Sequence, residues 1–365
     1  MKAIVLAGGY ATRLRPISYA LPKLLFPVLG KPMIYWTLDM LKALHVEKVV
    51  LAVNYLAELL QAEVGSSYEG IDIEYSPENS PLGTGGPIKL ASRTTRFDET
   101  FIAMNGDVIA NIDLRKMLEH HKSTKASVTD ALHEVRNPAR FGSVKVDRQG
   151  CIRRFVEKPT TRERLSHLVN AGIYMIEPEV LTMIPPDRKV SLEREIFPLL
   201  VEDGKLFGFP FSGDWFDIGN VTDYQKANFS LLKKHARDGA SHQNKFRVAK
   251  GGIIKSPSIL GEGSKVDAGA RLGPNVIGGK VEWIQEAARV SNSILFDQVT
   301  IGAESVVNGA ILATGVVVGK RVKIEAGSII SPQVEIRDGV KVGRNAIIHP
   351  HKEIQSNIAP GTHVM

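Results

Sequence analysis

The chain has 365 residues, enough for two or three domains, and 43% of them are hydrophobic while 23% are charged. This is the composition of a folded protein with its own apolar core, so wholesale disorder is excluded. The single cysteine, Cys151, excludes an internal disulfide framework and a multi-cysteine zinc site, and it favours a cytoplasmic location. No apolar run approaches the roughly 20 residues of a membrane span, so we expect no membrane association.

The net charge of +7 is unevenly distributed along the chain. The first 36 residues hold five basic side chains and no acidic one, and this basic segment contains a pair of glycines. A second basic stretch, 226–250, is poor in hydrophobic residues and is interpreted as a solvated connector. The pattern favours a small phosphate-bearing ligand near the N-terminus, and we expect no nucleic-acid partner.

Strand and helix signals alternate through the first half of the chain. Residues 3–7 form a short apolar run before Gly8-Gly9, which predicts a buried strand and its turn. Further strands are predicted at 48–53 and 101–105, and helices at 32–44, 56–64, 114–122 and 221–235. This alternation predicts an α/β domain with a mostly parallel sheet. Ligands of such sheets bind beyond the carboxyl ends of the strands, where the glycine-containing turns after Ala7 and Asn105 lie.

From Ile254 the hydrophobic pattern has a period of six. Positions 254 to 296 in steps of six, followed by a slip of four and positions 300 to 348 in steps of six, are apolar at fifteen of seventeen sites. This period is typical of a parallel β-helix, whereas a run of β-hairpins has period two and would drift out of phase. We therefore predict a first domain at 1–235, a linker at 236–250 and a β-helix at 251–365.

The segment from Leu6 to Arg13, with Lys23 further on, has the composition of a phosphate site. Glycines after a strand allow backbone N–H groups to approach an anion, and Arg13 and Lys23 add charge-assisted contacts. The segment matches neither the dinucleotide fingerprint nor the P-loop. A tight turn beside a solvated basic face is the alternative interpretation.

Two aspartates stand where a magnesium ion could bind. Asp107 follows the predicted strand 101–105, and Asp217 lies in a distant Trp-Phe-Asp-Ile-Gly segment. Mg²⁺ prefers one or two carboxylates together with phosphate oxygens. Each aspartate taken alone is better explained by turn formation next to glycine, whereas the two together with a polyphosphate site favour the metal interpretation.

Two further segments contribute polar groups. Glu157 and Lys158 are expected to follow a strand and, on an extended backbone, to point in opposite directions, so that one accepts from sugar hydroxyls while the other holds a phosphate. The glycine-rich loop 81–87 precedes a helix, and its amides could read the edge of a base. The histidines at 120, 121, 349 and 351 lack metal-ligand spacing and are interpreted as surface or turn residues, and Cys151 as inert.

Together these segments resemble the sugar-nucleotide pyrophosphorylases (NDP-sugar nucleotidyltransferases) over essentially the whole chain. The resemblance implies a Rossmann-like nucleotidyltransferase domain with a mostly parallel mixed sheet, followed by a left-handed parallel β-helix of hexapeptide repeats. Residues 81–87, 191–198 and 350–354 are most similar to the mannose-1-phosphate guanylyltransferases. Ala11 stands where the family usually has glycine, and residues 22–27 are nearer to the glucose-1-phosphate thymidylyl- and uridylyltransferases, which remain the alternative.

The resemblance also implies a role for each matching residue. Arg13 and Lys23 would hold the triphosphate of an NTP, GTP being favoured, and Lys158 would hold the sugar 1-phosphate, mannose 1-phosphate being favoured. Asp107 and Asp217 would bind Mg²⁺. The nucleotide-binding set is Leu6, Ala7, Gly8, Gly9, Arg13, Lys23, Leu82, Gly83, Thr84, Gly85 and Asp107, and the sugar-binding set is Gly142, Glu157, Lys158, Asn170 and Gly172.

Other functions of the same fold are weighed against this one. A non-catalytic regulatory subunit would be expected to lose phosphate or metal ligands, and all of them are present here. An acyltransferase β-helix commonly uses a histidine between coils, and none occurs between Lys245 and Ile348. We expect the β-helix to serve assembly and regulation, with a homo-oligomer forming through its open coil faces.

Overall fold

The computed structural model describes residues 1–238 and 246–365; residues 239–245 of the expected linker lie outside the described residues. The contacts divide the chain into two compact units. The first comprises residues 1–10, 22–24 and 33–218, and the second comprises residues 11–21, 25–32 and 219–365. Each unit is described by itself below.

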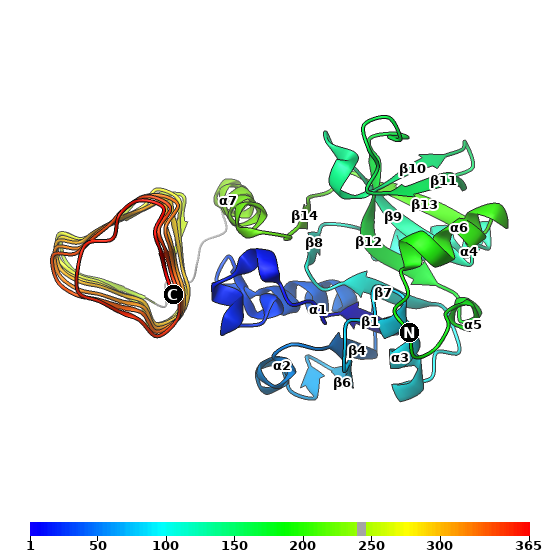
Figure 1. The fold of residues 1–365 in the computed structure, drawn as a ribbon, viewed down its shortest axis with the longest axis horizontal. Helices are drawn as coiled ribbons and strands as arrows, with labels where there is room; N and C mark the ends of the chain where they lie inside the picture. Colours follow the sequence, from blue (N-terminus) through cyan, green and yellow to red (C-terminus); the bar gives the residue numbers. More distant parts are fainter. Residues whose placement is uncertain (239–245) are drawn as a thin grey trace. The chain divides into compact units, whose positions relative to one another are not determined.

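The first unit is built on a ten-stranded mixed sheet (Figure 1). Its main path runs β11-β10-β12-β7-β1-β4-β6-β5, with β9 pairing β12 and β13. The neighbours β7, β1, β4 and β6 are parallel, whereas β12 is antiparallel to β7. The strands are β1 (Lys2–Leu6), β4 (Lys48–Val53), β5 (Ser67–Tyr68), β6 (Ile71–Pro77), β7 (Phe101–Asn105), β9 (Val128–Glu134), β10 (Gly142–Val146), β11 (Ile152–Glu157), β12 (Leu168–Ile176) and β13 (Leu206–Phe211), and a separate ribbon pairs β8 (Val108–Ala110) with β14 (Trp215–Asp217).

Helices connect these strands, and the start of α4 has a side-chain cap. The Asp113 side chain accepts the N–H groups of Arg115 and Lys116 at the start of α4. Gly85 precedes α3, whose second residue is Pro87. The helices of this unit are α1 (Met33–Ala43), α2 (Ala57–Val64), α3 (Gly86–Thr94), α4 (Leu114–Thr124), α5 (Val180–Met183), α6 (Phe197–Glu202), the 3-10 turns η3 (Lys23–Leu25) and η4 (Pro138–Arg140), and the π-helical turn η5 (Leu192–Ile196).

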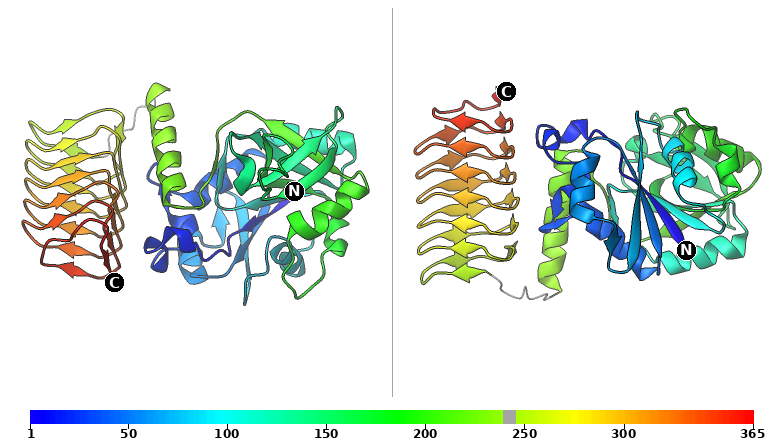
Figure 2. Two further views of the ribbon diagram at one scale, coloured as in Figure 1. Left: turned by 45° about the horizontal axis from the view of Figure 1, so that its top comes forward. Right: turned by 90° about the horizontal axis from the view of Figure 1, so that it is seen from below.

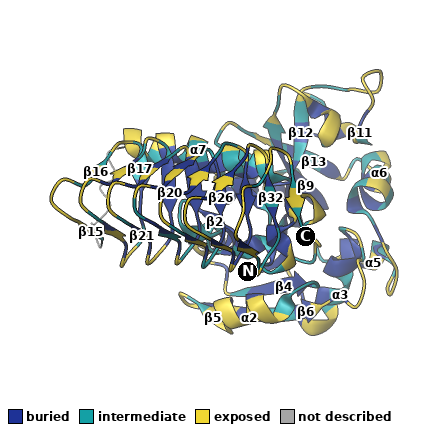
Figure 3. Cartoon of the chain, turned by 60° about the vertical axis from the view of Figure 1, so that its left-hand side comes forward, coloured by how far each residue is buried: buried dark blue, intermediate teal, exposed yellow. Residues whose placement is uncertain are grey.

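An apolar cluster fixes α3, α5 and α6 on one face of the sheet. Ile88 of α3 and Phe197 of α6 pack in it with Ile4 and Val50 of the central strands. Strand β4 is coloured as buried in Figure 3, and all its residues from Val49 to Val53 are buried. The predicted strands and helices of this half are confirmed within a few residues at their ends.

The second unit contains a parallel β-helix whose coils stack in three sheets (Figure 2). Figure 1 shows the coils end-on as a triangle, and the fold is consistent with the predicted left-handed β-helix. One sheet runs β15-β18-β21-β24-β27-β30-β33, the second β16-β19-β22-β25-β28-β31 and the third β17-β20-β23-β26-β29-β32-β34. The strands are β15 (Arg247–Val248), β16 (Ile253–Ile254), β17 (Ser258–Ile259), β18 (Lys265–Val266), β19 (Arg271–Leu272), β20 (Val276–Gly278), β21 (Trp283–Ile284), β22 (Arg289–Ser291), β23 (Ser293–Leu295), β24 (Thr300–Ile301), β25 (Val306–Asn308), β26 (Ile311–Leu312), β27 (Val317–Val318), β28 (Lys323–Ile324), β29 (Ile329–Ile330), β30 (Glu335–Ile336), β31 (Lys341–Val342), β32 (Ile347–Ile348), β33 (Glu353–Ile354) and β34 (His363–Val364).

The period of six is confirmed, but the predicted position of the slip is wrong. Core residues step by five from Val290 to Leu295 and again from Val307 to Leu312, with steps of six between them. Two shortened corners therefore replace one slip of four, and successive coils there pair 17 residues apart, as Val290 does with Val307. Consequently Phe296 and Val306, both predicted to point inward, lie outside the core cluster.

The second unit also includes α7 (Val221–Arg237), the 3-10 turns η1 (Thr12–Leu14) and η2 (Ile17–Tyr19), and the short strands β2 (Pro27–Val28) and β3 (Lys31–Pro32). The rings of Phe26, Tyr224 and Phe296 pack edge to face, with centroids 5.7–6.2 Å apart. The Tyr224 hydroxyl donates to the backbone oxygen of Pro27 at 2.5 Å. This cluster attaches α7 and the segment 25–32 to the coil that carries Phe296.

Within residues 1–238 and 246–365, no helix has the length and apolar character to cross a bilayer.

Candidate active site

The loops that follow β1, β4, β6 and β7 meet at one edge of the sheet because these strands are parallel. They place Gly8, Asn54, Glu78 and Asp107 at that edge. Backbone hydrogen bonds tie the loops together: Ala7 N donates to Ala52 O at 2.8 Å, and Gly106 N donates to Leu6 O at 3.0 Å. The edge is therefore held by main-chain bonds beyond the strand ends, as a preformed binding site requires.

Lys23, Asp107 and Asp217 come together at this edge. The Lys23 ammonium contacts Asp107 Oδ2, and both side chains are partly buried. Asp217 lies opposite Val108 in the ribbon of β8 and β14, one residue after Asp107, and Ile218 N donates to Asp107 O at 3.1 Å. Lys23 therefore contacts Asp107 directly, and the backbone pairing brings the chain at Asp217 next to Asp107, although the three residues come from distant parts of the sequence.

Asp107 and Asp217 are the residues that would hold a divalent metal ion brought by a nucleotide, because both are acidic and their backbones lie side by side. Among residues 1–238 and 246–365, no group of three or more His, Cys, Asp or Glu side chains is arranged to hold a metal alone. A hard cation with one or two carboxylates needs phosphate oxygens and waters to complete its coordination. The Asp107 side chain remains 31% exposed, which leaves it accessible to such a ligand.

The sugar end of the expected site lies on β10 and β11. Gly142 pairs directly with Glu157, and a β-carbon added to Gly142 would lie 2.5 Å from Phe155 Cζ and 3.0 Å from Glu157 Oε2. Burial raises the pKa of the Glu157 carboxyl, and the charge of Glu193 raises it further. Gly142 is therefore required to make room for the ring of Phe155 and for the partly desolvated carboxyl group of Glu157.

Lys158 departs from the extended geometry that the sequence suggests. The segment from Phe155 to Glu157 forms part of β11 itself, and Lys158 then adopts a left-handed conformation with φ of 50°. Its ammonium consequently lies 3.8 Å from Glu157 Oε1, on the same side rather than opposite. The expectation that the two side chains point apart is wrong, because the strand ends at Glu157.

Asn170 and Gly172 lie where the pairing of β12 with β9 shifts register. Asn170 Oδ1 accepts Gly172 N at 2.7 Å, and Asn170 Nδ2 donates to the Tyr174 hydroxyl at 2.9 Å. Gly172 has a φ of +75°, and an added β-carbon would lie 2.5 Å from Asn105 Nδ2. Only glycine fits there. Trp215 Nε1 donates to Ala171 O at 3.0 Å, which connects this turn to the strand carrying Asp217.

The loop from Leu82 to Gly85 is fixed by the segment 190–193. Gly85 N donates to Val190 O and Val190 N to Leu82 O, both at 2.9 Å. Thr84 Oγ1 donates to Glu193 Oε2 at 2.6 Å and accepts Leu192 N at 2.9 Å. The expected base loop is therefore tied to the π-helical turn η5, a type of irregularity that is frequent at functional sites.

Arg13 belongs to the second unit, in η1, and its side chain is exposed. Ala11 precedes it in the left-handed conformation, with φ of 48° and ψ of 39°. Glycine adopts this conformation without steric cost, which explains why a glycine suits the position and why alanine is a mild departure.

Sequence reasoning missed three carboxyl groups of the first unit. Glu78 follows β6, Glu193 lies on η5, and Asp130 is fully buried on β9 without a hydrogen-bond partner among the residues that the structure describes. Burial, followed by the charges of Glu193 and Glu157, raises the pKa of Asp130 well above its ordinary value. A charged residue within the otherwise uncharged segment 128–132 is the only sequence signal for it.

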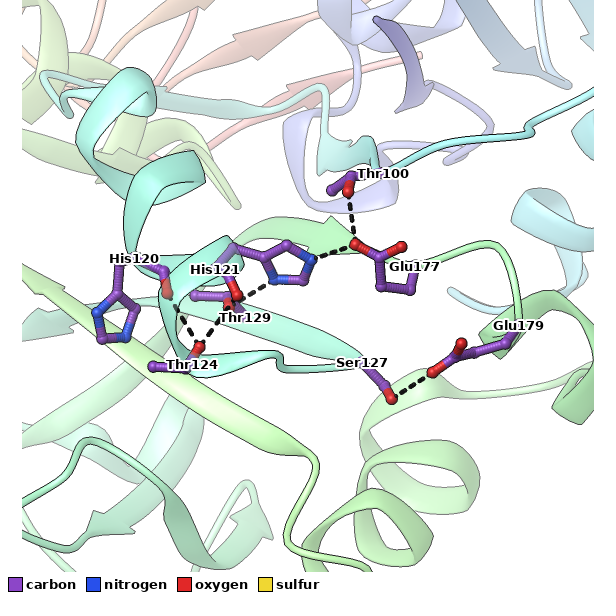
Figure 4. Close-up of polar contacts among 8 residues, drawn as sticks. All are labelled: Thr100, His120, His121, Thr124, Ser127, Thr129, Glu177 and Glu179. Atoms are coloured by element: carbon purple, nitrogen blue, oxygen red, sulfur yellow. Dashed lines mark hydrogen bonds and ion pairs between the residues drawn. The ribbon is translucent and has the colours of Figure 1, made fainter.

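One histidine also differs from its sequence interpretation. His121 is buried rather than at the surface, and its ring contacts Thr129 Oγ1 at 2.8 Å and Glu177 Oε1 at 2.9 Å (Figure 4). Glu177 also accepts a hydrogen bond from Thr100. These partners give His121 a structural role in holding α4 against β9 and β12.

The first unit thus has the fold and the charged groups of an enzyme that handles phosphates, and comparisons with known proteins agree. The nucleotidyl transferase family matches residues 2–234, and the GMPPB C-terminal domain matches residues 254–364. The chain belongs to the nucleotidyl transferase family, whose members generally use a divalent metal ion.

Individual relatives extend the similarity over most of the chain. A mannose-1-phosphate guanylyltransferase of Mycobacterium tuberculosis is 34% identical over 84% of this chain and 82% of its own. A probable mannose-1-phosphate guanylyltransferase 2 of Oryza sativa subsp. japonica is 33% identical over 89% of both chains. The chain is therefore a member of the sugar-1-phosphate nucleotidyltransferases that include these enzymes.

Solved structures share the fold of part of the chain. A putative glucose-1-phosphate thymidylyltransferase from Bacillus anthracis has a TM-score of 0.58 at 27% identity and covers 63% of this chain and 94% of its own. HddC from Yersinia pseudotuberculosis, solved in complex with GMP-PN, has a TM-score of 0.53 at 28% identity and covers 63% of this chain and 99% of its own.

Proposed function

We propose that this chain forms GDP-mannose and pyrophosphate from GTP and mannose 1-phosphate. The observation that carries the proposal is the convergence of Lys23, Asp107 and Asp217 at the carboxyl edge of the sheet. The substrates are inferred from the relatives that match most of the chain, which are named for guanylyl transfer to mannose 1-phosphate. The domain division proposed from sequence, 1–235 and 251–365, is supported by the two family matches.

The reaction joins two polyanions in a single displacement. A phosphate oxygen of the sugar 1-phosphate forms a bond to the α-phosphorus of the nucleotide, while the bond from that phosphorus to the bridging oxygen of the β-phosphate breaks and pyrophosphate leaves. The nucleophile is already an anion, so no covalent enzyme intermediate is needed. Two unit charges 4 Å apart repel by about 4 kcal/mol at an effective dielectric constant near 20, so charge neutralisation and alignment are the main tasks of the protein.

Each predicted residue has a task in this scheme. Lys23 and Arg13 bind the triphosphate, and Lys158 binds the phosphate of the sugar. Glu157, Asn170 and the backbone at Gly142 and Gly172 orient the sugar hydroxyls. Asp107 and Asp217 would hold Mg²⁺, which supplies positive charge to the phosphates. Lys23 would then transfer its contact from Asp107 to phosphate oxygens.

We further propose that the protein works in the cytoplasm as a homo-oligomer that associates through the β-helix. Support for association comes from the coil surface, where the apolar side chains of Trp283 and Val317 are 45% and 42% exposed.

The proposal is tested by measuring pyrophosphate release for GTP, ATP, CTP, UTP and dTTP against mannose 1-phosphate and glucose 1-phosphate. We expect the highest kcat/KM for GTP with mannose 1-phosphate. The Asp107→Asn variant, which keeps the size of the side chain and removes its charge, should lose at least a hundredfold in kcat while remaining folded by circular dichroism. A preference for UTP or dTTP would overturn the base assignment, and a near-normal rate for Asp107→Asn would overturn the metal assignment.

A further inference from the structure

One face of the β-helix carries an ordered row of outward side chains. It is the sheet β15-β18-β21-β24-β27-β30-β33, called below the β15–β33 sheet, in which each strand belongs to the next coil of the stack (Figure 2). The second residue of each strand from β18 onward lies in the apolar core, so the first residue points outward. In stack order the outward residues are Arg247, Lys265, Trp283, Thr300, Val317, Glu335 and Glu353.

The β15–β33 sheet is charged at its two ends and apolar near its centre. Its first two outward residues are basic and its last two are acidic, while Trp283 and Val317 stand one coil on either side of Thr300. Trp283 and Val317 are 45% and 42% exposed. In the β17–β34 sheet, by contrast, the outward residues Ile277 and Ile294 are fully buried. That sheet is therefore covered, whereas the centre of the β15–β33 sheet is an apolar surface that the described residues leave exposed.

The order of the outward residues makes this face complementary to a second copy of itself. Consecutive coils are about 4.8 Å apart, so residues at equal distances from Thr300 along the stack meet when a second stack runs in the opposite direction. A two-fold axis along β24 produces this arrangement, and the same patch then serves both copies. The facing pairs are Arg247 with Glu353, Lys265 with Glu335, Trp283 with Val317, and Thr300 with Thr300.

A further pair of opposite charges follows the same symmetry. Asp267 Oδ2 accepts Trp283 Nε1 at 2.8 Å, so Asp267 lies on this face. Arg337 Nη1 lies 2.8 Å from Glu335 Oε1, so Arg337 lies on it as well. Asp267 stands two coils before Gly302, and Arg337 stands two coils after it. The two-fold axis therefore also brings Asp267 of one copy to Arg337 of the other.

Other arrangements of the two copies bring like charges together or lose facing pairs. Two stacks that run in the same direction would place Arg247 against Arg247 and Glu353 against Glu353, and these pairs repel. A shift by one coil would place Lys265 opposite Val317 and leave Glu353 with no coil opposite it. The charges therefore select the antiparallel arrangement centred on Thr300.

We propose that two copies of this chain associate side by side and antiparallel through the β15–β33 sheet. The inference rests on the proposed function only in taking the β-helix as the site of association, and it adds which face binds and in which orientation. Burial of Trp283 against Val317 occurs twice in the symmetric dimer and supplies most of the affinity. Exposed ion pairs add little affinity, but they fix the orientation and the register.

Charge reversals at Lys265 and Glu335 test the pairing in the full-length chain. Each single variant, Lys265→Glu or Glu335→Lys, meets a like charge at two places in the symmetric dimer. Its dissociation constant in sedimentation equilibrium should therefore rise about tenfold or more. An equimolar mixture of the two variants should associate with near wild-type affinity, because each variant supplies the charge that the other requires. The double variant should also associate like the wild type.

Two further variants test the apolar centre and the choice of face. Trp283→Ala should raise the dissociation constant at least tenfold, as expected for an aromatic residue at the centre of an interface. Arg271→Glu makes the same kind of charge reversal at an exposed outward position of β19, in the second sheet of the β-helix, and should leave the dissociation constant unchanged. Far-UV circular dichroism should show the wild-type fold for every variant.

The possible failures point to different parts of the proposal. An oligomer whose dissociation constant is unchanged in Lys265→Glu and Trp283→Ala would overturn this face, while leaving association through another surface and guanylyl transfer intact. Failure of the two single variants to associate when mixed would overturn the antiparallel order. A wild type that stays monomeric while forming GDP-mannose would overturn association altogether without touching the catalytic assignment.

Discussion

At the scale of the residue, Asp130 shows the clearest conflict between burial and charge, because folding buries its ionisable carboxyl group. It lies fully buried on β9, and its oxygens have no partner within the part of the chain that the structure describes. Tyr174 lies opposite it on β12 and bonds to Asn170 of the expected sugar site, while Glu157 and Glu193 act on it through their charges. A neutral, protonated Asp130 is the form that this environment favours.

The conflict predicts how stability depends on pH. The pKa of Asp130 is about 3.9 in the unfolded chain and is raised in the folded one, so its contribution to stability is present below pH 4 and is lost as pH rises through the folded pKa. The Asp130→Asn variant has no ionisable group at this position, so it does not lose stability in this way as pH rises. Relative to that variant, the wild type should lose about tenfold in its folding equilibrium per pH unit between the two pKa values.

Chemical unfolding of both proteins from pH 4.5 to 8 measures this difference. Asp130→Asn should be the more stable protein at pH 8, with a margin that shrinks as pH falls. Glu134→Gln, an exposed change at the end of the same strand, serves as control and should show no such trend. A constant margin for Asp130→Asn would show that the carboxyl ionises normally.

At the scale of the element, His121 anchors α4 to the sheet. Its ring is bonded to Thr129 of β9 and to Glu177, which follows β12, and His120 and Lys122 are the charged neighbours on its own helix. Burial lowers the pKa of His121, although Glu177 acts in the opposite direction. The neutral ring is therefore the form that joins these elements.

A lowered histidine pKa makes the anchor sensitive to acid. Its contribution to stability is present above the unfolded pKa of about 6.5 and is lost as pH falls through the folded pKa. His121→Gln should lower Tm at pH 7.5 by several degrees, and the difference from wild type should shrink by pH 5. His351→Asn, a change at an exposed coil corner, should show a small and pH-independent effect. A difference for His121→Gln that grows on acidification would contradict the neutral anchor.

At this scale, an element or residue could be predicted from the sequence when its signal comes from residues that are neighbours in the chain. The strand 48–53 could be read from sequence because an apolar run is a property of neighbouring residues. Lys23 and Asp107 could be found because glycine, charge and strand ends occur together in short motifs. Glu78 and Asp130 could not, since their significance depends on which strands are adjacent, as β6 is to β4 and β9 to β12. The shortened corners at Val290 and Val307 were likewise obscured because Phe296 and Val306 are apolar but face outward.

At the scale of the whole molecule, the chain combines two kinds of structure. One is a mixed sheet whose candidate site lies at the carboxyl ends of its parallel strands, and the other is a β-helix whose coils repeat along one axis. Each coil contacts its neighbours through the same three sheets, so the coils are stabilised mainly by one another. The helix α7 and the segment 25–32 are different, because they have no such repeating partner. The cluster of Phe26, Tyr224 and Phe296 gives them an apolar attachment to a coil.

This arrangement predicts that Phe296→Ala loosens α7 without unfolding the coils. Truncating a fully buried phenylalanine costs about 3–5 kcal/mol, and here the loss falls on the rings of Phe26 and Tyr224 rather than on the inward-facing core. Hydrogen exchange should accelerate in residues 221–237 by at least tenfold, while the coil strands keep wild-type protection. Val317→Ala, an exposed change on β27, should leave α7 unaffected. Slow exchange of α7 in Phe296→Ala would mean that the bond from Tyr224 to Pro27 and the contact of Asn228 with Leu29 suffice to hold the helix.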